Sequence, residues 1–143
     1  MKSSNYIKLE FPSRSSNESF ARSAVAAFAL SLDPSLDELG DVRTAVSEAV
    51  TNAIVHAYPD SLGIVYVRAR IVDGDVLEIA VKDKGRGIDD VERAMQPLFT
   101  TGGEERSGMG FTIMDSFMDK VRVRSNPGKG TSVTMTKRIR SKK

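Results

Sequence analysis

The spacing of apolar side chains changes once near the middle of the chain, and this change limits the possible folds more than any other feature. Residues 42–54 carry apolar side chains at positions i, i+3 and i+4, which predicts a helix with one apolar face. Residues 63–72 and 75–82 instead alternate apolar and polar side chains around Asp73-Gly74, a strong hairpin signal. Such a helix must bury its apolar face, so we expect it to pack on the sheet that the hairpin begins.

The flanking segments add further helices and strands. Residues 6–11 predict a first strand, Ser16 or Asn17 can cap a helix that reaches Leu30, and Asp41 can cap the helix with the apolar face. Toward the C-terminus the pattern predicts a short helix at 90–95, a helix at 109–117 and strands at 120–125 and 131–137. We therefore expect an α/β two-layer sandwich. Its mixed, mostly antiparallel sheet carries helices on one face and leaves the other face uncovered.

Length and composition narrow the class of protein. The 143 residues fit one domain, 1–143, and the absence of cysteine excludes disulfides, zinc–thiolate sites and a thiol nucleophile. The longest apolar run, 24–30, is too short to span a bilayer, and the first residues contain no apolar signal-peptide core. We expect a soluble cytoplasmic domain with no membrane partner.

The positive net charge of +2 comes from the C-terminus. Residues 137–143 hold five basic residues and no acidic one; without them, 16 basic residues face 19 acidic ones, a net charge of −3. This distribution indicates a solvated basic tail rather than a nucleic-acid-binding face spread over the domain. No direct contact with nucleic acid is expected.

Two segments carry polar groups suited to a phosphate ligand. Glu48 and Asn52 lie one helical turn apart, so that a carboxylate and a carboxamide can share a hydrated magnesium ion. Ser-Gly-Met-Gly at 107–110 opens a helix, and the free N–H groups of a helix N-terminus suit a phosphate. Each segment also has a simpler explanation, because acidic helix surfaces carry Glu and Asn for solubility and serine is a common N-cap.

Two glycine-containing segments lie beside predicted strands. Asp-Lys-Gly-Arg-Gly-Ile at 83–88 offers close backbone approach to a ligand, and its acid can accept a hydrogen bond from an exocyclic amine such as that of adenine. Gly-Lys-Gly-Thr at 128–131 is a hairpin turn whose threonine can complete an adenine pocket. Taken singly, each is an ordinary turn. The P-loop, the dinucleotide-binding glycine fingerprint and the His-Arg-Asp and Asp-Phe-Gly segments of protein kinases are absent.

Together and in this order, these four segments resemble the ATP site of the Bergerat-fold superfamily of GHKL ATPases and kinases. Within it, SEAVTNAIVHAY at 47–58, QPLFTT at 96–101 and RSGMGFTIM at 106–114 are similar to the sporulation anti-sigma-F factors, a family of serine-protein kinases. The similarity covers residues 5–137. It implies an ATP-dependent protein serine/threonine kinase that uses ATP and Mg²⁺ and releases ADP.

The resemblance implies a role for single residues. Asn52 is expected to hold the magnesium ion that bridges the phosphates, and Glu48 to orient or deprotonate the attacking hydroxyl. Asp83 is expected to bind the adenine amine with help from Thr131, and Arg106 to reach the terminal phosphate. The other positions expected to contact the nucleotide are Gly85, Gly87, Thr100, Thr101, Ser107, Gly108, Met109 and Gly110.

The resemblance also implies partners and a lid. The expected partners are the sigma factor sigma-F, held inactive by a homodimer of the kinase, and an anti-anti-sigma protein whose serine is the substrate. Glu18, Ser19 and Arg22 match the first-helix surface that contacts these partners in the family. Residues 89–107 are expected to form the ATP lid, in which Gly102-Gly103 replaces the Lys-Pro of typical members.

Other interpretations remain open from the residues alone. A related stress-response anti-sigma serine kinase differs only in its partners, and a nucleotide-gated binding module would lack useful catalysis. An ATPase fragment of a repair or topoisomerase protein is disfavoured by the short chain and the absence of a transducer domain. His56, the single histidine, lies one turn past Asn52 and is interpreted as a helix-rim residue rather than a phosphoacceptor.

Overall fold

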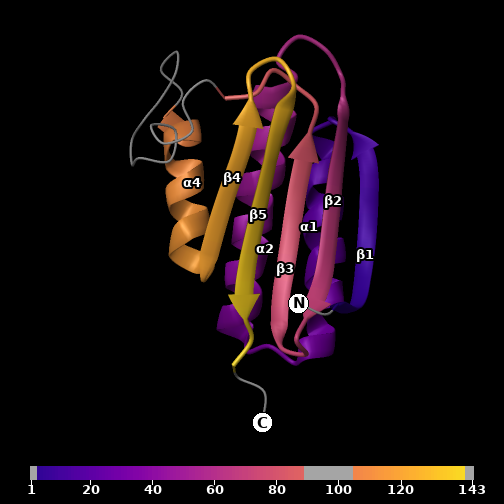
Figure 1. Cartoon of the computed structure of the whole chain (residues 1–143), viewed down its shortest axis with the longest axis vertical. Helices are drawn as coiled ribbons and strands as arrows, with labels where there is room; N and C mark the ends of the chain where they lie inside the picture. The colour runs from indigo at the N-terminus through magenta and orange to yellow at the C-terminus, as the bar shows by residue number, and fades with distance from the viewer. Residues whose placement is uncertain (1–2, 89–104, 141–143) are drawn as a thin grey trace.

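The computed structural model describes residues 3–88 and 105–140, with the backbone alone described for 105–109. Figure 1 shows one sheet, with helices behind it and the orange helix beside one edge. The elements in chain order are β1 (Ser3–Pro12), α1 (Ser16–Ala29), η1 (Leu30–Leu32), α2 (Leu36–Asn52), η2 (Ala53–Ala57), β2 (Ile64–Val72), β3 (Val76–Asp83), α4 (Glu105–Phe117), β4 (Lys120–Asn126) and β5 (Gly130–Arg138). The helix predicted at 90–95 lies outside the described residues.

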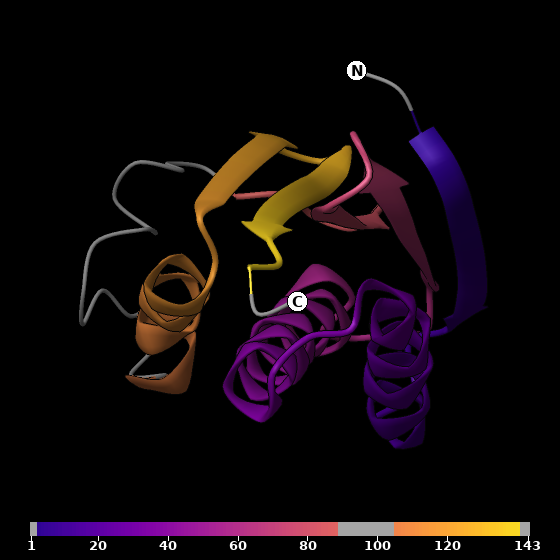
Figure 2. The same ribbon diagram turned by 90° about the horizontal axis from the view of Figure 1, so that it is seen from below.

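The sheet has the strand order β1-β2-β3-β5-β4, and every neighbouring pair is antiparallel. The predicted turn at Asp73 and Gly74 joins β2 to β3, and both residues have the positive φ angles, 55° and 84°, that a tight hairpin requires. Helices α1, α2 and α4 lie on one face of the sheet (Figure 2). The predicted two-layer α/β sandwich is therefore confirmed, with a sheet that is antiparallel throughout its described pairings.

The core lies between the sheet and the helices. The predicted apolar stripe of α2 is buried, and Val42, Val46 and Val50 have no exposed surface. They pack with alternate residues of β3, Leu77 and Ile79, which are also fully buried. Each such side chain contributes about 1.5–3 kcal/mol through its removal from water. No helix among the described residues is long and apolar enough to cross a membrane.

The predicted helix caps are wrong at both N-termini. Helix α2 begins at Leu36, where Ser35 Oγ accepts the Glu38 N–H and Glu38 Oε1 accepts the Ser35 N–H, both at 3.0 Å. This capping box precedes the apolar stripe because the first turn faces solvent, with Leu36 87% exposed. Helix α1 has Ser15 at its N-cap without a side-chain hydrogen bond. Asn17 instead donates to the carbonyl oxygen of Pro12.

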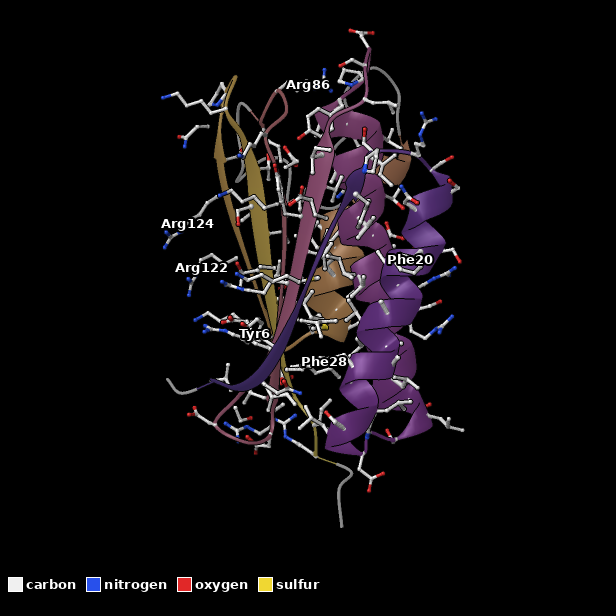
Figure 3. The ribbon with its side chains drawn as sticks, turned by 90° about the vertical axis from the view of Figure 1, so that its right-hand side faces the viewer. Tyr6, Phe20, Phe28, Arg86, Arg122 and Arg124 are labelled. Carbon is white, nitrogen blue, oxygen red and sulfur yellow. The ribbon has the colours of Figure 1, made fainter. Side chains whose placement is uncertain are left out.

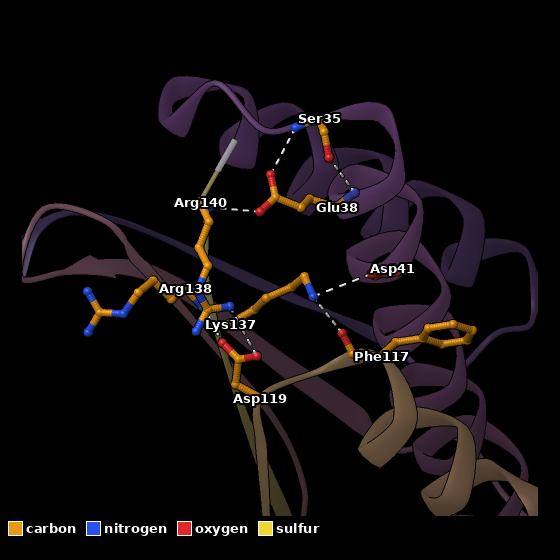
Figure 4. A network of polar contacts seen from close by, with 8 residues as sticks. All are labelled: Ser35, Glu38, Asp41, Phe117, Asp119, Lys137, Arg138 and Arg140. Carbon is orange, nitrogen blue, oxygen red and sulfur yellow. Dashed lines mark hydrogen bonds and ion pairs between the residues drawn. The ribbon is translucent and has the colours of Figure 1, made fainter. Parts of the chain in front are cut away.

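The prediction of a solvated tail is wrong for residues 137–140. Lys137 Nζ donates to the Phe117 carbonyl oxygen at 2.9 Å and lies 3.4 Å from an Asp41 carboxylate oxygen, as Figure 4 shows. The Arg140 N–H donates to Glu38 Oε2 at 2.7 Å, and Ile139 is only 4% exposed. Strand β5 continues to Arg138, and the charges are paired: Lys137 with Asp41 of α2, Arg138 with Asp75, and Arg140 with Asp119. Residues 141–143 lie outside the described residues.

The uncovered face of the sheet is basic. Register and strand alternation place Lys8, Arg68 and Lys82 on this face, and Figure 3 shows Arg122 and Arg124 pointing away from the helices. Among the described residues of the five strands, the acids on this face are Glu10 and Glu78, and Glu78 is paired with Arg70. A shallow groove of about 610 Å³ runs over it, lined in part by Lys8, Tyr66, Arg68, Lys82, Lys84 and Thr134. The strands thus gather basic charge that the linear sequence disperses.

Candidate functional site

Glu48 and Asn52 converge on a glycine of the neighbouring helix. Both side chains are half-buried on α2, which packs against α4. A Cβ atom added to Gly110 of α4 would lie 3.1 Å from Asn52 Nδ2, 3.4 Å from Asn52 Oδ1 and 3.4 Å from Glu48 Oε1. The Glu48 and Asn52 side chains therefore lie together against Gly110, and their carboxylate and carboxamide oxygens are donors that suit Mg²⁺.

Helix α2 does not end at Asn52 but continues for one π-helical stretch, Ala53–Ala57. Such wide turns are common at functional sites because they redirect backbone groups. Here the Ala57 carbonyl oxygen accepts the Arg86 N–H at 3.0 Å. A Cβ atom at Gly85 would lie 2.2 Å from the same oxygen, so this approach is possible only for glycine. The π-helical stretch thus holds the loop that follows β3.

Asp83 is the buried acid of the site, at the end of β3 and only 6% exposed. Burial raises the pKa of its carboxyl above the ordinary 3.8, opposed by hydrogen bonds from the Gly85 and Thr131 N–H groups. Among the described residues, both of these hydrogen bonds reach Oδ1, at 3.0 Å and 3.2 Å. Oδ2 is thereby left as an acceptor for an amine of a ligand.

The two glycine-containing segments lie side by side. The Gly128 N–H donates to the Arg86 carbonyl oxygen at 2.6 Å. A Cβ atom at Gly87, which has φ +78°, would lie 2.3 Å from the Asn126 carbonyl oxygen. A Cβ atom at Gly130 would meet the Asp83 carbonyl oxygen at 2.2 Å. The segments 83–88 and 128–131, separated by the whole of α4 and β4 in sequence, therefore form one wall.

The structure brings together most of the predicted site residues that it describes. Figure 1 shows the ends of α2 and β3 and the β4–β5 turn at one end of the molecule. Helix α4 begins at Glu105, earlier than predicted, so Arg106, Ser107 and Gly108 lie in its first turn and Met109 follows; their side chains are not described. The backbone N–H groups of a first helical turn have no partners within the helix, so they can bind a ligand. Gly110 lies beyond that turn, and its lack of a side chain lets Asn52 and Glu48 lie against it. Thr100 and Thr101 lie outside the described residues.

Two further residues of the site were missed from the sequence. Tyr58 accepts the Lys84 N–H at 2.7 Å and donates to the Ile64 carbonyl oxygen at 2.8 Å. Ser125 joins β4 to Thr131 and to Ile88. Neither carries a local signal, since Lys84 is 26 positions from Tyr58 and Ile88 is 37 positions from Ser125. Glu18, Ser19 and Arg22 lie on α1, where Glu18 and Arg22 form an ion pair at 3.5 Å.

Comparison with known proteins decides the family. Residues 11–137 match a family described as the histidine kinase-like ATPase domain. An anti-sigma F factor of Caldanaerobacter subterraneus subsp. tengcongensis is 59% identical over 140 residues, 97% of each chain. The chain belongs to the anti-sigma F factor family. A relative with the same description from Clostridium kluyveri is 56% identical over 134 residues, covering 93% of this chain and 94% of its own.

Solved structures agree with the fold of the anti-sigma F factor family. The RsbU and RsbW domains of Rv1364c from Mycobacterium tuberculosis superimpose with a TM-score of 0.70, covering 95% of this chain and 32% of that one. Their sequence identity of 18% means that this likeness shows the fold alone. The family match shows an anti-sigma factor with a kinase-like, nucleotide-binding ATPase domain, rather than the ATPase of a repair or topoisomerase protein.

The close approach of Asn52 and Glu48 to Gly110 allows a test that separates nucleotide binding from stability. Gly110→Ala is expected to weaken ATP binding about ten-fold, because the new methyl group crowds Asn52 and Glu48. The free energy of unfolding should not fall correspondingly, since alanine is favoured over glycine inside a helix by about 1 kcal/mol. Calorimetry with ATP and thermal unfolding measure the two effects.

Gly40→Ala in α2 is the matched control for this test. No atom lies within 4 Å of the Cβ it would add, so it should gain the same helix propensity without any loss of ATP affinity. Equal ATP affinities of the two variants would show that the space beside Gly110 is not used by the nucleotide.

Proposed function

We propose that this chain is an ATP-dependent protein serine kinase that also sequesters a sigma factor. Its substrate is a serine of an anti-anti-sigma protein, and the sequestered factor is the sporulation sigma factor sigma-F. The observation that carries the proposal is the convergence of Glu48 and Asn52 beside Gly110, at the same end of the molecule as the Asp83 pocket. Phosphoryl transfer requires both a fixed nucleotide and an oriented acceptor, and these two groups of residues supply them.

Each residue of the proposed site has a separate role. Asp83 accepts the adenine amine at Oδ2, and Thr131 completes the base pocket beside it. Asn52 and Glu48 supply the oxygen atoms that fit a magnesium ion, which neutralises phosphate charge when bound. Glu48 orients the serine hydroxyl or takes its proton. Arg106 and the first-turn amides of α4 are assigned to the phosphates, and residues 89–107 to the lid of a single domain, 1–143.

The direct test is incubation of the full chain with radiolabelled ATP, Mg²⁺ and the anti-anti-sigma protein. We expect label on a serine of the partner and none on His56. Calorimetric binding of ATP without any transfer would identify a nucleotide-gated binding module instead. Absence of ATP binding by the folded chain would contradict the proposal altogether.

The surface proposed to contact the partners lies on α1. Ser19 is exposed beside the Glu18–Arg22 ion pair, and Phe20 is 63% exposed on the same helix (Figure 3). An exposed aromatic next to a charged pair is typical of a protein-binding surface. Pull-down with sigma-F in ATP, in ADP and without nucleotide tests this assignment. Binding of a stress-response sigma factor instead would identify the related kinase.

A homodimer is proposed through the uncovered face of the sheet, which includes β1. Two copies of that basic face repel each other at low ionic strength, because Lys8, Arg68 and Lys82 meet like charges. Raising the salt concentration from about 50 mM to about 500 mM should therefore lower the dimer dissociation constant several-fold, through screening. Light scattering across a dilution series measures this constant.

Two variants test whether the dimer contact lies on the sheet. Arg68→Ala should strengthen the dimer at low salt, whereas Arg43→Ala, an exposed change on α2, should leave it unchanged. A monomeric mass at micromolar concentration in both salts would contradict the homodimer. A dimer weakened by salt would place the contact on another surface.

A further inference from the structure

Ser125 links the two segments that form the wall of the proposed base pocket. This half-buried serine lies near the end of β4, and its Oγ accepts the Ile88 N–H at 2.7 Å. The same atom lies 2.8 Å from Thr131 Oγ1, where either hydroxyl can be the donor, and 3.1 Å from the Gly130 carbonyl oxygen, to which Ser125 can donate. Three partners thus surround a hydroxyl group that has only one proton to donate.

The direction of that one proton decides what Thr131 presents to a ligand. If Ser125 donates to the Gly130 carbonyl oxygen, the short contact requires Thr131 to donate to Ser125, and Thr131 then offers only acceptor lone pairs. If Ser125 donates to Thr131 Oγ1, the proton of Thr131 is released for the ligand. The Ile88 N–H is satisfied in both arrangements, since Ser125 Oγ keeps a lone pair for it.

A purine base distinguishes the two arrangements. Adenine presents an exocyclic amine, a donor, next to a ring nitrogen that is an acceptor. Asp83 Oδ2 can take the donor, so the neighbouring group must be a donor to pair with the ring nitrogen. Guanine and hypoxanthine present the reverse pattern at this edge, an oxygen acceptor next to a ring N–H donor, and leave the carboxylate facing an acceptor.

We propose that Ser125 is a positioning residue for adenine selectivity, which it exerts by donating to Thr131 and so turning the threonine proton toward the base. This inference rests on the proposed ATP-binding function and adds to it a residue outside the four sequence segments. Ser125 also holds Ile88, the last described residue before position 89, against β4. Together with the hydrogen bond between Gly128 and Arg86, this contact shapes the pocket before the nucleotide binds.

The experiment compares Ser125→Ala with Ser132→Ala in the full chain. Ser132 is a serine of the adjacent strand β5 on the uncovered face, one residue from Thr131, and it is the matched control. Dissociation constants for ATP and GTP are measured by calorimetry, with thermal unfolding recorded for each variant. We expect Ser125→Ala to weaken ATP binding about ten-fold and to lower the preference for ATP over GTP by a similar factor, because binding of GTP gains nothing from the threonine proton.

A purely structural role of Ser125 would lower the unfolding temperature and weaken both nucleotides equally. Ser125→Thr, which keeps the hydroxyl group, should restore the ATP preference. If Ser125→Ala does not fold, Ser125→Cys carries the same prediction, since a thiol fills the site but is a weak donor. An unchanged ATP preference in the folded variant would overturn the inference. Failure of the unaltered chain to bind ATP would instead overturn the proposed function.

Discussion

Glu48→Gln is expected to lower the rate of phosphoryl transfer by about 100-fold or more while ATP affinity stays within about three-fold. Glutamine keeps the size of the side chain and one oxygen atom beside Gly110, so the space for the phosphates is unchanged. It removes the carboxylate that we propose accepts the serine proton, and such general-base catalysis contributes about 10²–10⁴-fold. Initial rates with radiolabelled ATP and calorimetric ATP titrations measure the two quantities separately.

Asp37→Asn is the control for this variant. Asp37 lies in the first turn of the same helix, is exposed, and is far from the end of α2 that carries Asn52. This variant should keep both the rate of phosphoryl transfer and the affinity for ATP. Wild-type transfer by Glu48→Gln, or by Glu48→Ala with normal ATP binding, would remove Glu48 from the mechanism and leave positioning to the other residues.

Asp83→Asn is expected to abolish useful ATP binding and yet leave the fold as stable as before or more stable. The carboxylate that we propose accepts the adenine amine is replaced by an amide whose NH₂ group would face another donor, which costs about 100-fold or more in affinity. The carboxamide of this variant can keep an oxygen where Asp83 Oδ1 now accepts the Gly85 and Thr131 N–H groups. Calorimetry and thermal unfolding at neutral pH test both halves of this prediction.

The stability half follows from the sign of the pKa shift. Burial raises the pKa of Asp83 above 3.8, so the folded chain binds this proton more tightly than the unfolded chain does. Its contribution to stability is fully present below the unfolded pKa and is lost as pH rises through the folded pKa. The stability of Asp83→Asn relative to the unaltered chain should therefore increase as pH rises through the folded pKa. A variant that becomes less stable as pH rises through this range would show that the two backbone hydrogen bonds outweigh burial.

The repeating patterns of apolar residues were sufficient to predict the helix and strands that carry the candidate site. The stripe through Val42, Val46 and Val50 is the buried face of α2, and the predicted hairpin turn has the backbone angles that Asp73 and Gly74 favour. These features depend on residues within a few positions of one another, so they are already expressed in the local sequence. The order of the four segments was likewise sufficient to point to a nucleotide site.

The ends of elements were predicted less well, because the apolar pattern says little about turns that face solvent. Helix α2 starts at Leu36 through the Ser35–Glu38 capping box, although its apolar stripe begins a turn and a half later. The C-terminal residues were interpreted as a tail from their charge alone. Lys137 is instead held by Asp41, an acid almost a hundred positions away in sequence.

The sequence by itself determined the two-layer fold, the family and the segments of the nucleotide site, since periodicity and motif order are properties of the linear chain. Only the tertiary structure decided that Gly110 leaves space for Glu48 and Asn52, and that Ser125 joins Ile88 to Thr131. It also decided that the uncovered sheet face is basic, because strand pairing places Lys8 beside Arg68. The physical reason is that contacts between residues far apart in sequence, such as Ser125 and Ile88 across 37 positions, depend on how helices and strands pack, and no local pattern encodes them.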